Sequence, residues 1–214
     1  MDHLDLLKKD WQKAKQQFPK KSATEIYAML LKKSSSIVKW IFIISIAEVV
    51  FWNILALLVP ESSKKIYELM GLETLMLVTM VFGYVVTAVF LYLFYRNYIK
   101  IKVTDTIKQL MTNILRTRKV VRYFVYYNIG ASILLLVIMN VYYYFRRADL
   151  YEIFSQFEGY KDLPPENFNT IFFTAQLIVG VGIFIFLVLF YRIVYGILLR
   201  RLKRNYKELK KIEL

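Results

Sequence analysis

Hydrophobic residues are collected into four long blocks along this chain, with the charged residues gathered between them. Each block exceeds the roughly 20 residues that a helix needs to cross the hydrocarbon core of a bilayer. Transmembrane β-strands are about 10 residues long and alternate in polarity, and these blocks do neither. The pattern predicts four transmembrane helices, at about residues 37–59, 72–95, 120–145 and 171–199.

These helices predict an all-α integral membrane protein built as a four-transmembrane-helix bundle. Residues 1–36 would form an amphipathic helical tail, residues 37–199 the membrane domain and residues 200–214 a basic helical tail. The tetrapeptide Leu-Phe-Tyr-Arg occurs near the ends of the second and fourth spans, at 93–96 and 189–192. This match is consistent with two tandem helical hairpins, but chance similarity between apolar helices with aromatic ends explains it equally well.

The basic residues are distributed unevenly between the two sides of the predicted bundle. Of the 30 Lys and Arg, 25 lie before or just inside the first span, between the second and third spans, or from Arg192 to the C-terminus. The positive-inside rule places both termini in the cytoplasm, so we expect a multi-pass protein of the bacterial inner membrane. Topology and anionic lipid headgroups explain the net charge of +14, and no nucleic-acid partner is expected.

The residues that most enzymes use are scarce in this sequence. There is no cysteine, and the one histidine is His3 at the N-terminus. Thiolate and haem sites, zinc sites and a histidine general base inside the membrane are therefore not expected. We predict a protein with no catalytic residue, no metal and no cofactor.

Amphipathic segments precede and follow the predicted spans. In the tail before Pro19, basic residues lie on other faces than an apolar stripe, and this pattern predicts an amphipathic helix that Pro19 ends. The apolar stripe consists of Leu4, Leu7, Trp11, Ala14 and Phe18. Ser22 and Glu25 have the spacing of a capping box for a second short helix to Lys33. The second and fourth spans are expected to continue as helices on the basic side, and residues 150–157 to form a short helix on the other. The tail helices could bind the lipid surface or a protein partner.

Glu48 is an acidic residue near the middle of the first predicted span. A carboxylate there is costly, so Glu48 should face the bundle interior, with Ser45 and Trp52 on the same helical face. No Lys or Arg is expected at its depth. One interpretation is a proton- or cation-linked site or a polar contact in an assembly. The other is a neutral acid bonded to an Asn, Gln or Tyr, with three candidate partners, namely Asn128, Ser132 and Gln176.

Small residues mark the places where helices could approach each other closely. Thr79, Gly83 and Thr87 repeat at four-residue spacing in the second span, and Gly180 lies in the fourth. Small residues at this spacing are typical of packing surfaces between membrane helices. We therefore predict helix packing at these positions.

The stretches 5–11, 25–27 and 32–40 resemble an uncharacterised family of small four-span inner-membrane proteins of flavobacteria and their relatives. Members of this family are often labelled carotene oxygenases. Those oxygenases hold iron with four histidines, and this chain has one. The resemblance therefore implies a compartment but does not identify an activity.

Two hypotheses about function remain. In the first, the chain is a non-catalytic membrane subunit or adaptor whose cytoplasmic amphipathic helices bind a membrane or cytoplasmic protein or the lipid surface. In the second, it is a small transporter or channel that uses Glu48. Four helices leave little room for a solute path, so the second hypothesis requires a homo-oligomer.

Overall fold

A computed structural model describes residues 22–104, 106–157, 159–161 and 163–213. Every regular element in these ranges is an α-helix, and the elements are α2 (Ala23–Leu57), α3 (Glu61–Leu69), α4 (Glu73–Lys102), α5 (Ile107–Phe145), α6 (Arg147–Ser155) and α7 (Pro165–Glu213). Four of them, α2, α4, α5 and α7, are long and apolar enough to cross a membrane. The fold is thus all-helical with four candidate spans, as predicted, which indicates a multi-pass membrane protein.

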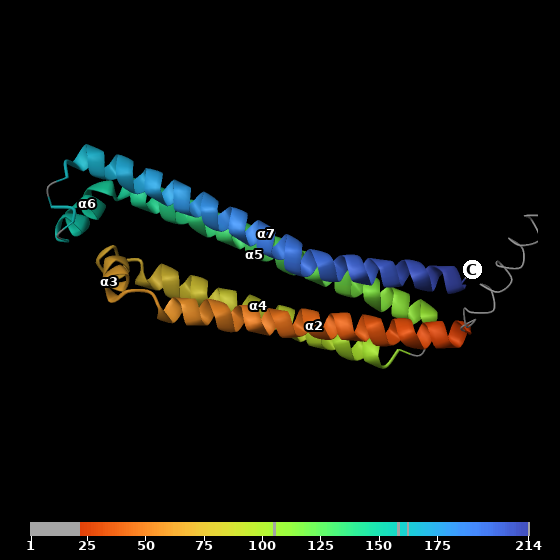
Figure 1. Cartoon of the computed structure of the whole chain (residues 1–214). Coiled ribbons are helices and arrows are strands. Elements are labelled where there is room, and N and C mark those ends of the chain that lie inside the picture. The colour runs from red at the N-terminus through yellow and green to blue at the C-terminus, as the bar shows by residue number, and fades with distance from the viewer. Residues whose placement is uncertain (1–21, 105, 158, 162, 214) are drawn as a thin grey trace, which may run out of the picture.

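The four long helices form an elongated bundle of two antiparallel hairpins (Figure 1). Helix α2 pairs with α4 and α5 with α7, while α2–α7 and α4–α5 contacts join the hairpins. The short helices α3 and α6 lie at one end, which we call the capped end (Figure 1). The opposite end, where α2 begins and α7 ends, is called the basic end. Pairing of consecutive helices agrees with the expected hairpins, whereas their origin by duplication stays a hypothesis.

Helix α2 begins at the capping box that the sequence predicts. Ser22 Oγ accepts a hydrogen bond from the backbone N–H of Glu25, whose side chain accepts from the N–H of Ser22. The helix does not end at Lys33 as expected but continues to Leu57. Neither Gly nor Pro interrupts it, and Ser34 is buried against Asn205 of α7 with a hydrogen bond of 3.0 Å. The proposed domain boundaries at 36 and 199 fall inside continuous helices and stay predictions.

The half of the bundle next to the basic end, which we call the closed half, has a continuous core. Buried side chains recur on α2 and α7 at alternating spacings of three and four residues, the packing pattern of left-handed helical bundles. Its largest members come from all four long helices and include Ile41, Phe94, Ile101, Leu110, Ile114, Tyr195, Leu202 and Leu209.

A second, smaller core lies at the capped end. Helices α3 and α6 and the start of α7 pack there around Met70, Leu72, Met139, Tyr143, Leu150, Ile153 and Phe168. The sequence predicted α6 but not α3, whose first five residues are polar or charged and look like a loop. Gly71, with φ +69°, turns the chain from α3 into α4 in the left-handed conformation that favours glycine.

Between the two cores the helices bury very little, and we call this region the open half. The buried stripe of α2 ends at Glu48, and α5 has no buried residue between Phe124 and Met139. Large apolar side chains are exposed here on all four long helices, among them Phe51, Phe82, Leu134 and Leu177. Such a surface suits contact with lipid, because lipid chains are as apolar as these side chains.

Candidate functional site

Glu48 is held by two tyrosines of α7 at the junction of the closed and open halves. Glu48 is buried, with only 7% of the residue exposed. The hydroxyl of Tyr195 donates to Glu48 Oε2 at 2.9 Å, and the hydroxyl of Tyr191 donates to Oε1. The two tyrosines are four residues apart, so one face of α7 directs both hydroxyls at the carboxyl group.

The hypothesis of a neutral acid bonded to an Asn, Gln or Tyr included tyrosine, but none of its three named candidates bonds Glu48, and the neutrality of the acid stays a prediction. Asn128 instead donates to the backbone oxygen of Phe124 at 2.9 Å, and Ser132 donates to that of Ile129 at 2.8 Å. Gln176 Oε1 is buried with no hydrogen-bond partner among the described residues. Neither Tyr191 nor Tyr195 was predicted as a partner of Glu48, although both share the buried stripe of α7 with Leu198 and Leu202.

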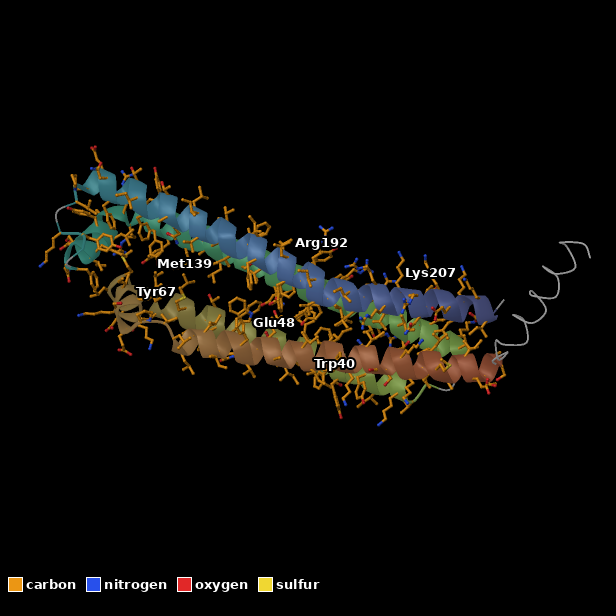
Figure 2. All side chains as sticks on the ribbon, in the orientation of Figure 1. Trp40, Glu48, Tyr67, Met139, Arg192 and Lys207 are labelled. Carbon is orange, nitrogen blue, oxygen red and sulfur yellow. The ribbon has the colours of Figure 1, made fainter. Side chains whose placement is uncertain are left out.

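The contact with α7 also corrects the expectation that no Lys or Arg lies level with Glu48. Tyr191 is followed directly by Arg192, so a basic residue does lie level with Glu48. Figure 2 shows Arg192 on the outer side of α7, pointing away from Glu48. Among the described residues Glu48 forms no salt bridge. The carboxyl group therefore has a basic residue level with it but no paired cation among the described residues.

Aromatic side chains pack against the two tyrosines that hold this carboxyl group. The ring of Phe124 on α5 lies 5.7 Å from that of Tyr195 and 6.3 Å from that of Tyr191, measured between centroids. Phe90 and Phe94 of α4 contact the same ring at 5.3 and 5.4 Å. Three of these four pairs are edge-to-face, which is a favoured geometry for aromatic rings. The cluster belongs to the core of the closed half.

A cavity of about 550 Å³ begins at Glu48 and extends into the open half. Its walls come from α2, α4 and α5 and include Glu48, Trp52, Phe82, Tyr84, Phe124 and Tyr127. Asn53 accepts a hydrogen bond of 2.5 Å from the Tyr84 hydroxyl on this wall. Ser45 is buried on the other side of Glu48, and its hydroxyl donates to the backbone oxygen of Phe42 at 2.8 Å.

The small residues expected to pack helices have different surroundings. Thr79, Gly83 and Thr87 line the cavity, and no atom lies within 4 Å of a Cβ added at Gly83. A Cβ added at Gly180 would lie 2.6 Å from Leu136 Cδ1, so α7 does approach α5 closely there. Packing by the stripe on α4 stays a prediction. Leu4, Leu7, Trp11 and Phe18 of the tail helix lie outside the described residues.

A groove of about 670 Å³ lies between α2 and α7 near the basic end. Four cations line it, namely Lys32, Lys33, Arg201 and Arg204, together with Ser36, Ile37, Met29 and Asn205. Among the described residues, Arg204 forms a salt bridge of 3.9 Å with Glu208, and the other three cations form none. The hydrogen bond between Asn205 and Ser34 joins the two helices beneath this groove, which we call the basic groove.

The two sites differ in the chemistry they allow. A carboxyl group with two phenol donors can bind a proton or a cation, and an uncompensated basic groove can bind an anionic surface. The described residues contain no cluster of three metal-ligating His, Asp or Glu side chains. The candidate site at Glu48 is therefore defined by its carboxyl group and by the apolar walls of its cavity.

Comparison with known proteins assigns the chain to a family. Residues 24–214 match a domain of unknown function (DUF8845). No curated protein and no solved structure matches the chain. The match agrees with the expected uncharacterised family, while the flavobacterial origin stays a prediction. Since the match covers α2 to α7 without interruption, the chain belongs to the family of the domain of unknown function DUF8845.

Proposed function

We propose that this protein is a non-catalytic membrane adaptor of the bacterial inner membrane, with its basic end in the cytoplasm. The observation that carries the proposal is the basic groove between α2 and α7, whose cations exceed the nearby acids. The excess of Lys and Arg at this end supports the orientation through the positive-inside rule. An acidic surface of a partner protein is the occupant that this charge favours.

The packing of the closed half supports a docking role. All four long helices contribute to its core, and the hydrogen bond between Asn205 and Ser34 fixes α2 against α7 under the groove. A surface carried by rigid helices loses little conformational freedom when a partner binds. The tail helix with Leu4, Leu7, Trp11 and Phe18 would add an apolar contact or hold the lipid surface.

The test is a gentle-detergent pull-down of the tagged full-length protein with mass determination of what remains bound. We expect one stoichiometric partner with wild type, and its loss with the double change Arg201→Glu and Arg204→Glu in the groove. The matched control changes the exposed Arg116 and Lys119 of α5 to Glu, which alters net charge equally outside the groove. A homo-oligomer carrying only lipid would contradict the adaptor, as would a partner that both variants retain equally.

A second candidate is a small oligomeric transporter or channel with Glu48 as a proton- or cation-linked site. The cavity that begins at Glu48 favours this alternative. The packed closed half opposes a path through a single chain, so the alternative needs a second chain or a rearrangement of the core. Glu48→Gln should then abolish flux while leaving the assembly intact. An adaptor should tolerate Glu48→Gln and lose its partner when Leu7 and Trp11 become Ala.

A further inference from the structure

We propose that the cavity beside Glu48 is a binding site for a lipophilic organic cation, such as an amine or phosphonium with apolar substituents. The ligand would place its charge beside the carboxyl group and its substituents against the apolar walls. This inference gives a ligand class to the transporter alternative, but it concerns binding and does not require transport.

The charge of the cavity lining points to a cation. Glu48 is its one acidic residue, and no Lys, Arg or His lies among the described residues that line it. The nearby Arg192 is exposed on the outer side of α7 (Figure 2) and forms no salt bridge with Glu48. An anion would be repelled here, and a small hydrated cation would meet mostly apolar walls that cannot replace its water.

The walls point to apolar, polarisable substituents. Trp52, Phe82, Tyr84, Phe124 and Tyr127 present aromatic rings from three helices to one cavity. Aromatic faces attract organic cations, and this attraction is strongest where water is excluded. The volume of about 550 Å³ lies within the range of pockets that take drug-sized molecules.

The position of the cavity gives a route of entry. It lies in the open half, and lining side chains such as Phe82, 60% exposed, face the surroundings of the bundle. If the four long helices cross the membrane, this surface meets lipid, where a lipophilic cation would concentrate. The ligand therefore does not need to pass through the closed half, which is packed around Phe94 and Tyr195.

The bonds of Glu48 also suit a site that exchanges partners. Both oxygens accept from tyrosine hydroxyls, so the carboxyl group stays oriented when no ligand is bound. A carboxylate has room for further contacts beyond two hydrogen bonds. An arriving cation can therefore approach from the cavity while Tyr191 and Tyr195 hold the group from α7.

Equilibrium binding to the purified full-length protein in detergent tests the inference. The probe is methyltriphenylphosphonium, and the neutral comparison is triphenylphosphine oxide, which has a similar shape. We expect saturable binding of the cation with one site per chain and no comparable binding of the neutral compound. Glu48→Gln should weaken cation binding by about thirtyfold or more, because it removes the buried opposite charge.

A pair of glycine variants separates the cavity from the charge. Gly83→Leu would fill the cavity with Glu48 still in place, since nothing lies within 4 Å of a Cβ at Gly83. Gly182→Leu is the matched control, because a Cβ there is equally unobstructed and Gly182 does not line the cavity. We expect loss of binding with the first and wild-type binding with the second.

Four results would overturn the inference: no binding of the cation, equal binding of the neutral compound, binding that survives either Glu48→Gln or Gly83→Leu, or loss of binding with Gly182→Leu. Folding of each variant is checked by its elution profile and helical content. If Glu48→Gln does not fold, the two glycine variants and the neutral compound still test the inference. A cation that binds but is not moved across vesicles would contradict the transporter alternative alone, and failure to bind would leave the adaptor proposal unaffected.

Discussion

The closed and open halves are built from the same four helices and differ in what those helices bury. In the closed half, apolar residues recur every three or four positions on each helix and meet in one core. In the open half the same helices carry large apolar side chains all round, and few of them meet. The first pattern selects one helix face for packing, whereas the second leaves every face suited to lipid.

The ends of the bundle show how the open half is bounded. At the capped end the hydroxyl of Tyr142 on α5 donates to the backbone oxygen of Met70 at 2.6 Å, which joins the two hairpins. At the other boundary Glu48 joins α2 to α7 through Tyr191 and Tyr195. The hairpins are thus connected at both ends of the open half, and Glu48, the only acid among the described residues that line the cavity, lies at the connection next to the closed half. Stability should therefore depend on the closed half, and ligand chemistry on the open one.

The largest expected effect comes from cutting the core of the closed half. Leu202 is fully buried, so Leu202→Ala should lower the free energy of unfolding by about 2–5 kcal/mol. Leu134 in the open half is 60% exposed, and Leu134→Ala should change it by no more than about 0.5 kcal/mol. Unfolding of both variants in mixed detergent measures the difference. Equal losses would mean that the open half is packed as tightly as the closed half, for example against a second chain.

Hydrogen bonds between helices sharpen the comparison at a smaller scale. Asn205→Ala leaves the buried Ser34 without its partner, at an expected cost of about 1–3 kcal/mol. In a double-mutant cycle with Ser34→Ala, the double variant should lose less stability than the sum of the two single variants. Tyr84→Phe removes the bond to Asn53 from a residue that is 47% exposed, and should cost less than about 1 kcal/mol. A larger loss for Tyr84→Phe than for Asn205→Ala would reverse the assignment of the two halves.

The smallest effects are expected at two glycines. Gly83→Ala meets no atom within 4 Å and should stabilise α4 by up to about 1 kcal/mol, because alanine favours the helix. Gly180→Ala gains the same preference but presses on Leu136 Cδ1, so its net effect should be less favourable. Leu136 is exposed and can rotate, which limits the loss. If Gly83→Ala destabilises the assembled protein, a second chain must pack on the stripe of Thr79, Gly83 and Thr87.

The sequence by itself determined the elements, because their causes are local. Four apolar blocks long enough to span a bilayer predicted α2, α4, α5 and α7. Ser22 with Glu25 predicted a helix start where α2 begins, although that helix was expected to end at Lys33. Singling out Glu48 also needed only the sequence, since an acid in an apolar block is costly wherever the block packs. The short helix α3 was missed because its polar first turns resemble a loop.

The tertiary structure decided the contacts between helices, which the spacing of residues along one helix does not determine. The contact of Glu48 with Tyr191 and Tyr195 depends on how far α7 is shifted along α2, and this shift is set by packing across the bundle. The same shift puts Arg192 level with Glu48 and the exposed side chains of the open half around a cavity. Periodicity shows which face of a helix is apolar, but only the register between helices decides which residues meet, and whether a face meets a neighbour or lipid.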